Sequence, residues 1–144
     1  MDRAALDFAI DHGIEHGGCC PQGRLAEDGR IEDKYNLREM DSAAYDDRTR
    51  KNVMDSDATL IVVRDYRLRG GTALTRDVAI ELDRPVLVVC EADGAAVGAS
   101  RVAAFVKRHA IRTLNVAGPR ESEAPGLDWF VHRVLDALLK FRQR

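Results

Sequence analysis

The most informative stretch of the sequence, residues 58–82, reads as a buried strand, a pair of glycines and a helix. Residues 59–63 form a continuous apolar run rich in β-branched side chains, which is typical of a strand covered on both faces. After Gly70 and Gly71, apolar residues recur every four positions, as on one face of a helix: Leu74, Val78 and Leu82. The first N–H groups of a helix lack intrahelical acceptors and lie at the positive end of its dipole. We therefore expect this turn to bind phosphate or another oxyanion.

Strands and helices alternate along the C-terminal half of the chain. Two further apolar runs are predicted as buried strands, over residues 85–90 and 113–117, and two amphipathic patterns as helices, over residues 99–109 and 127–141. This alternation is typical of a parallel sheet with right-handed crossovers, and 144 residues suit one domain. We predict an α/β fold with a Rossmann-like doubly wound parallel sheet, in three α/β/α layers, as a single domain over residues 1–144.

The N-terminal third has weaker patterns. Residues 2–11 are predicted as a helix with an apolar face made of Ala5, Leu6, Ala9 and Ile10. Residues 14–20 are a weak strand candidate, and residues 35–40 are a short extended segment. Between them lies a loop over residues 21–35 that has no periodicity, and loops of this length in a compact domain are often functional.

A polar helix is predicted over residues 43–54, with Ser42 as its cap. Arg48 and Asn52 lie four positions apart and therefore on one face of this helix. Two interpretations remain open: a solvated surface helix, or a helix that lends a polar edge to a ligand cleft.

Composition narrows the possible partners. The net charge of −2 gives no basic footprint, so we expect no nucleic acid partner. No apolar run approaches the roughly 20 residues that cross a bilayer, and no leader pattern is visible, so we expect no membrane association and a cytoplasmic location. The three cysteines cannot form an even disulfide framework, and free thiols in a reducing compartment are the simplest interpretation.

Two turns follow predicted parallel strands and therefore meet at one edge of the sheet, where ligands of such folds bind. The first offers backbone N–H donors and a hydroxyl, from Gly70, Gly71 and Thr72. The second offers a guanidinium that could clamp a phosphate and another hydroxyl, from Gly118, Arg120 and Ser122. Each turn alone could be a tight connection only, but two at one edge favour an anion site.

Other kinds of site find less support. The glycines match neither a Walker loop nor the Gly-x-Gly-x-x-Gly pattern, and no Ser-His-Asp set can be proposed from spacing. His16 with Cys19 or Cys20 lacks a full set of metal ligands, so we predict no metal site. Trp129 and Phe130 are better explained by packing than by base stacking.

Several segments together resemble the molybdenum-carrier family, a branch of the Rossmann-like nucleotide-ligand-binding superfamily that also contains the cytokinin-type phosphoribohydrolases. These segments cover nearly the whole chain: residues 2–7, 20–24 with 27–29, 48–49 with 52, 55–59, 70–72 and 114–122. The last of them is the most specific. The resemblance implies a small phosphorylated or oxyanionic ligand, which could be the molybdenum cofactor or a nucleotide. Arg24, Arg48 and Asn52 are additional candidates for binding it.

Two departures from the family pattern affect the expected function. Members usually begin with a strand and a Gly-Gly-Gln-Thr-Gly loop before Asp-Arg-Ala-Ala-Leu-Asp, and we expect the natural chain to begin upstream with these elements. Without them we expect an open sheet edge and a tendency to form homo-oligomers. The related phosphoribohydrolases also carry a catalytic Glu three residues after their threonine, where this chain has Thr75. A binding or carrier protein is therefore favoured. The alternatives are a nucleotide-processing hydrolase that cleaves an N-glycosidic bond and a truncated paralogue that binds no ligand.

Overall fold

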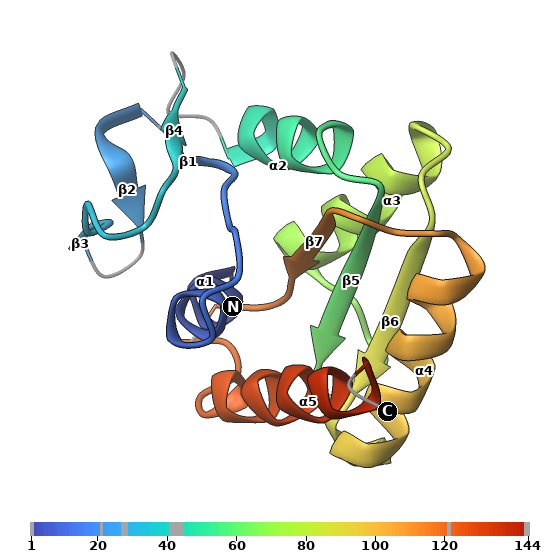
Figure 1. Cartoon of the computed structure of the whole chain (residues 1–144). Helices are drawn as coiled ribbons and strands as arrows, with labels where there is room; N and C mark the ends of the chain where they lie inside the picture. Colours follow the sequence, from blue (N-terminus) through green and yellow to red (C-terminus); the bar gives the residue numbers. More distant parts are fainter. Residues whose placement is uncertain (1, 21, 27–28, 41–44, 121, 143–144) are drawn as a thin grey trace.

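A three-stranded parallel sheet forms the centre of the molecule (Figure 1). The computed structural model describes residues 2–20, 22–26, 29–40, 45–120 and 122–142. The sheet has the order β6–β5–β7 and is made of β5 (Ala58–Val63), β6 (Val86–Cys90) and β7 (Leu114–Ala117). Both pairings are parallel, with Ile61 opposite Val88 on one side and Ala117 on the other. The predicted parallel sheet is confirmed.

Five helices of the described chain surround this sheet: α1 (Asp2–Asp11), α2 (Tyr45–Met54), α3 (Gly70–Glu81), α4 (Ala95–Arg108) and α5 (Leu127–Arg142). Leu60 and Val62 of β5 belong to one hydrophobic cluster with residues of α1, α4 and α5. On the opposite face, Val86 of β6 packs against Val78 of α3 and Val53 of α2. Helices therefore cover both faces, and the predicted α/β/α layering is confirmed.

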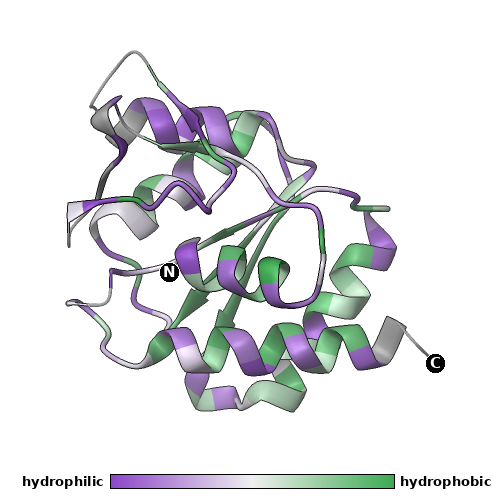
Figure 2. Ribbon diagram, turned by 60° about the vertical axis from the view of Figure 1, so that its left-hand side comes forward, coloured by the Kyte–Doolittle hydropathy of each residue, from purple (hydrophilic) through white to green (hydrophobic). Residues whose placement is uncertain are grey.

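Burial of the central strand explains why its sequence is apolar throughout. All six residues of β5 are buried, because helices cover both faces and strands flank both edges. The one polar side chain, Thr59, is fully buried, and its hydroxyl accepts a hydrogen bond from Asn115 Nδ2 at 3.2 Å. Figure 2 shows the hydrophobic strands enclosed by helices of mixed character. Among the described helices, none combines the length and apolarity needed to cross a membrane.

The N-terminal third adds short elements beside α2. β1 (Cys19–Cys20) pairs in parallel with β4 (Arg38–Glu39), and β2 (Leu25–Ala26) pairs antiparallel with β3 (Gly29–Arg30). A 3₁₀ turn, η1, spans Gln22–Arg24. The strand expected over residues 14–20 is thus limited to its last two residues. The loop expected over residues 21–35 contains local structure, and the predicted cap Ser42 lies outside the described residues.

Several expected boundaries and faces are wrong in detail. α3 begins at Gly70 instead of residue 73, and α4 at Ala95 instead of residue 99. In α1 the expected Ala9 is buried, as are Ala4 and Phe8, whereas the expected Ile10 is 39% exposed. Trp129, which we expected to be packed, is 67% exposed, while its neighbour Phe130 is buried.

Candidate functional site

The carboxyl ends of the three central strands meet at one edge of the sheet, which we call the carboxyl edge (Figure 1). From there the chain passes through residues 64–69 into α3, through residues 91–94 into α4, and through residues 118–126 into α5. Because β5 and β7 are paired parallel neighbours, the two turns singled out in the sequence, residues 70–72 and 118–122, follow adjacent strands. The fold therefore brings these two turns to the same edge.

The first of these turns is the N-terminal turn of α3. Arg69 precedes the helix in an extended conformation, with φ −139° and ψ 158°, and its side chain makes no capping hydrogen bond. Its carbonyl oxygen accepts the N–H groups of Thr72 at 3.1 Å and Ala73 at 3.2 Å. The N–H groups of Gly70 and Gly71 precede these in the helix, where intrahelical acceptors are absent by geometry. The first turn of α3 can therefore donate backbone hydrogen bonds to an anion.

The two glycines of this turn differ in what their backbone requires. Gly70 has φ +51°, in the left-handed region that favours glycine. Gly71 lies outside that region, and among the described residues a Cβ built on it would meet no atom within 4 Å apart from its chain neighbours and the backbone of its own helix. Neither backbone conformation nor crowding from the described residues therefore requires glycine at position 71. The bare backbone there faces open space that a ligand could fill.

The second turn closes on itself. The carbonyl oxygen of Arg120 accepts the N–H groups of Glu123 at 2.9 Å and Ala124 at 3.0 Å. The N–H of Arg120 donates to the Glu123 carboxylate at 3.3 Å. Arg120 and Ser122 are both exposed, whereas Thr72 of the first turn is buried. This turn can therefore offer the charge of Arg120 to a ligand while its own backbone N–H is held by Glu123.

Arg64, which the sequence did not single out, links the loops that follow all three strands. Its Nε donates to the Glu91 carboxylate at 3.2 Å, and its Nη2 donates to the carbonyl oxygen of Pro125. The Sγ–H of Cys90 in turn donates to the carbonyl oxygen of Arg64 at 3.0 Å. An arginine directly after a buried strand was the available signal, but its partners are 27 and 61 residues away in the sequence.

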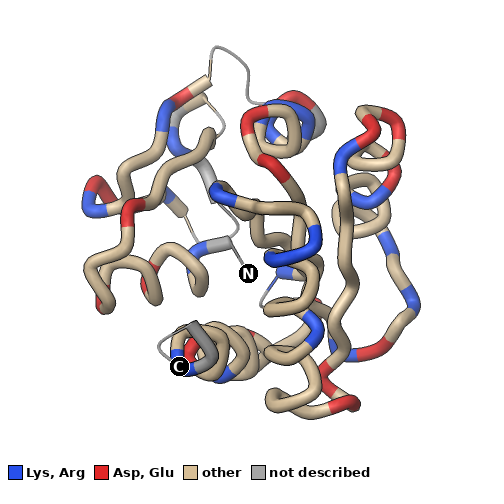
Figure 3. The backbone as a smooth tube through the Cα atoms, turned by 45° about the vertical axis from the view of Figure 1, so that its right-hand side comes forward, with Lys and Arg blue, Asp and Glu red and all other residues tan. Residues whose placement is uncertain are grey.

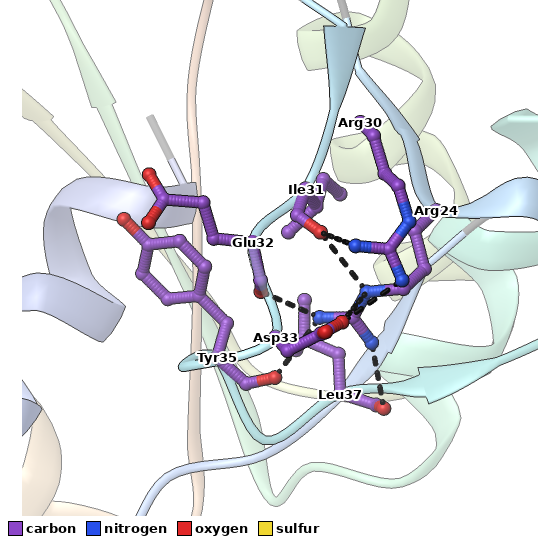
Figure 4. A network of polar contacts seen from close by, with 7 residues as sticks. All are labelled: Arg24, Arg30, Ile31, Glu32, Asp33, Tyr35 and Leu37. Atoms are coloured by element: carbon purple, nitrogen blue, oxygen red, sulfur yellow. Dashed lines mark hydrogen bonds and ion pairs between the residues drawn. The ribbon is translucent and has the colours of Figure 1, made fainter.

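Arg24 has a structural role in the N-terminal third (Figure 4). Its guanidinium donates to four backbone carbonyl groups: Ile31 at 3.0 Å, Glu32 at 2.8 Å, Tyr35 at 3.1 Å and Leu37 at 3.4 Å. The Arg24 side chain is only 11% exposed and also forms an ion pair with Asp33. Arg24 thus organises residues 31–37, and its contact with a ligand stays a prediction.

The remaining two candidates lie on α2. Asn52 holds β1 with a pair of hydrogen bonds, accepting the N–H of Cys19 at 2.8 Å and donating to its carbonyl oxygen at 3.3 Å. The Nε of Arg48 is buried. Burial raises the pKa of the Cys20 thiol, while Arg24 and Arg48 act on it in the opposite direction. The structure therefore groups Arg24, Arg48 and Asn52 around β1, and groups the two turns at the carboxyl edge.

Charge and metal ligands set further bounds on this edge. Figure 3 shows basic and acidic residues interspersed along the backbone. Within the described ranges, no three His, Cys, Asp or Glu residues gather as a metal site.

A parallel α/β sheet with a glycine-led helix N-terminus at its carboxyl edge defines a Rossmann-like ligand-binding domain. Comparison with known proteins then places the chain more narrowly. The model of the circularly permutated YpsA SLOG family matches residues 1–139, and the chain belongs to this family.

A solved structure supports this assignment. The chain is similar to a protein from Syntrophus aciditrophicus SB whose crystal structure carries the name "Putative molybdenum carrier protein". The two share 42% sequence identity and superpose with a TM-score of 0.93, over 96% of this chain and 87% of the other. No curated protein matches the chain. The resemblance stated from the sequence motifs is confirmed.

Proposed function

We propose that this protein binds a small phosphorylated or oxyanionic ligand at the carboxyl edge of its sheet. The backbone N–H groups of Gly70 and Gly71 donate to the anion, and Arg120 supplies positive charge from the neighbouring turn. Thr72 and Ser122 add hydroxyl groups. One observation carries the proposal: the glycine-led N-terminus of α3 and the turn that contains Arg120 follow adjacent parallel strands.

Carriage of the molybdenum cofactor is the specific role that we propose. Its support is the name of the similar protein, "Putative molybdenum carrier protein", at 42% identity. The cofactor is cargo here, and its phosphate is the part that the N-terminus of α3 would hold. We assign no protein ligands to the molybdenum of the cofactor, because no group of three His, Cys, Asp or Glu residues lies close together among the described residues.

The contacts of Thr75 favour binding over hydrolysis. This residue stands where the related phosphoribohydrolases carry a catalytic carboxylate, and it is buried. Its hydroxyl donates to the carbonyl oxygen of Gly71 at 2.8 Å, a bond within the first turns of α3. A general acid or base is therefore missing at that position, which supports a carrier over a hydrolase.

Calorimetric titration of the purified protein with inorganic phosphate, tungstate and AMP tests the proposed site. Arg120→Ala should weaken binding of these anions by about 1.5–3 kcal/mol, the range for a hydrogen bond to a charged group. Arg108→Ala is the matched control, because Arg108 is exposed at the C-terminal end of α4, away from the carboxyl edge. Equal affinities for both variants and the wild type would remove Arg120 from the site.

The cargo itself requires a different measurement. Native mass spectrometry of the protein purified from its own host should show a retained molecule with the mass of a molybdenum-bearing or phosphorylated pterin. A retained nucleotide would support the anion site but would show that the ligand is a nucleotide and not the molybdenum cofactor. Turnover of nucleoside monophosphates would overturn the carrier role in favour of the hydrolase.

A further inference from the structure

Tyr66 is an exposed aromatic residue at the carboxyl edge. It lies in residues 64–69, between the end of β5 and the first turn of α3, and it is 54% exposed. Trp129, which is 67% exposed, lies instead on α5 beside a shallow hollow lined by α1 and α5 residues, with the Arg133 guanidinium 4.8 Å from its ring centre. Tyr66 therefore differs from it in lying next to the proposed anion site.

The ring of Tyr66 is held in place by its hydroxyl. The O–H donates to the Asp93 carboxylate, and its oxygen accepts a hydrogen bond from Arg101 Nη1 at 3.2 Å. Asp93 lies after β6 and Arg101 lies in α4, so two separate elements anchor one phenol. An anchored ring loses little further freedom when something stacks on it, while more than half of its surface stays open to solvent.

The distance along the chain fits a ligand of modest size. Only three residues separate Tyr66 from Gly70, and the four Cα-to-Cα steps between them span at most about 14 Å. The segment also contains two exposed arginines, Arg67 and Arg69. An anion bound at the first turn of α3 would therefore lie no more than about 14 Å from Tyr66 along the chain, beside this positively charged stretch.

We propose that Tyr66 is a specificity-determining residue that stacks on the planar nitrogen heterocycle of the ligand. The inference rests on the proposed function, because it takes the phosphate of that ligand to lie at Gly70 and Gly71. A purine nucleotide and a phosphorylated pterin share this chemistry, and both contain a flat ring joined to a phosphate. Aromatic side chains bind such rings by stacking with little dependence on ring identity.

The test compares phosphate ligands with and without a planar ring. Wild-type protein is titrated with inorganic phosphate, ribose 5-phosphate, AMP and neopterin phosphate. Stacking contributes about 1–3 kcal/mol, so AMP should bind about 5- to 150-fold more tightly than ribose 5-phosphate. Comparing the affinity for neopterin phosphate with that for AMP shows which of the two rings is preferred. Tyr66→Leu should bring the ratio of ribose 5-phosphate to AMP affinity close to one, and Tyr66→Phe should retain a clear preference for AMP.

Controls separate this inference from the proposed function. Trp129→Leu removes an even more exposed aromatic ring from α5 and should leave the ratio unchanged. All variants should bind inorganic phosphate as the wild type does, which shows that the anion site is intact. A wild-type ratio of one, or an unchanged ratio in Tyr66→Leu, overturns the role of Tyr66 while the anion site stands. Failure of wild-type protein to bind any of the four probes overturns the proposed function, and the inference with it.

Discussion

The carboxylate of Asp57 accepts a hydrogen bond from the backbone N–H of Thr113 at 3.0 Å, directly before the first residue of β7. The same oxygen accepts the N–H of Arg112 at 2.9 Å, and the N–H of Asp57 donates to the carbonyl oxygen of Thr113 at 2.9 Å. One side chain thus fixes the start of β7 beside the start of β5. The backbone bonds from Thr113 and Arg112 lower the pKa of Asp57.

We expect this lowered pKa to appear as a pH-dependent contribution to stability. A carboxylate with a depressed folded-state pKa stabilises the fold above its unfolded pKa and loses that contribution as pH falls through the folded value. Asp57→Asn should therefore lower the melting temperature at pH 7, and its difference from wild type should shrink below about pH 4. Asp55→Asn, which removes only a surface ion pair with Lys51, is the control. A difference that is independent of pH would contradict the role of the charge.

Substitution of Gly71 should separate binding from stability. Because a Cβ at position 71 meets no atom within 4 Å, Gly71→Ala should leave the melting temperature unchanged or raise it. The same methyl group would occupy the space where an anion approaches the backbone, so affinity for phosphate should fall about ten-fold or more, or ~1.4 kcal/mol. Gly71→Val should be more severe for binding. Full affinity in both variants would show that the turn is only structural.

Gly70→Ala provides the contrasting variant. The φ of +51° at Gly70 is unfavourable for alanine by about 1–2 kcal/mol, so this variant should lose stability where Gly71→Ala does not. Chemical denaturation of both variants measures the difference. Equal stabilities would mean that the first turn of α3 relaxes around position 70.

Arg24→Met should destabilise residues 31–37. It leaves four backbone carbonyl groups without their charged donor, at a cost of about 1–3 kcal/mol. Hydrogen exchange of residues 31–37 should accelerate along with the loss of stability. Arg30→Met is the matched control, because the side chain of Arg30 is 58% exposed and pairs mainly with Asp33. Weaker phosphate binding without any loss of stability would instead make Arg24 a ligand residue.

Gly98→Ala should be destabilising for a steric reason. A Cβ at position 98 would lie 2.8 Å from Val89 Cγ1 and 3.3 Å from Val134 Cγ2, where α4 packs closely against β6 and α5. Such overpacking typically costs about 1–3 kcal/mol. Val97→Ala, one residue earlier and half exposed, is expected to be nearly neutral in urea denaturation. A wild-type urea midpoint for Gly98→Ala would show that the helix can move away from the sheet.

Local pattern was enough to predict the layers and the edge where the two turns meet. The β-branched run that became β5 and the apolar stripe of α5 each depend on residues close in sequence, and both are buried as expected. Helix boundaries that contain glycine were harder to predict. Gly70 and Gly71 were interpreted as a turn before the helix, but a bare backbone is tolerated in a first helical turn. In α1, Ala9 is buried as expected, but Phe8 is buried and Ile10 is exposed, because the side of the helix that meets the core depends on contacts with distant segments such as α5.

Contacts between distant segments could not be predicted from the sequence. Arg24 reads equally well as a phosphate ligand or as a structural cation, and only its four carbonyl partners reveal the structural role. The role of Tyr66 could not be predicted for the same reason, because its partners Asp93 and Arg101 are 27 and 35 residues further along the chain. Single residues of these types carry no periodic signal, so their roles become visible only in the folded chain.

The links made by Arg64 have a consequence for the thermodynamics of ligand binding. Because one guanidinium already joins the loops after β5, β6 and β7, their ordering takes place when the protein folds. Each side chain that must be immobilised on binding costs about 0.5–1.5 kcal/mol, and loops that are tied beforehand escape much of that cost. Binding at this edge should therefore resemble docking to a rigid surface, with a small entropic penalty and little rearrangement of the free protein.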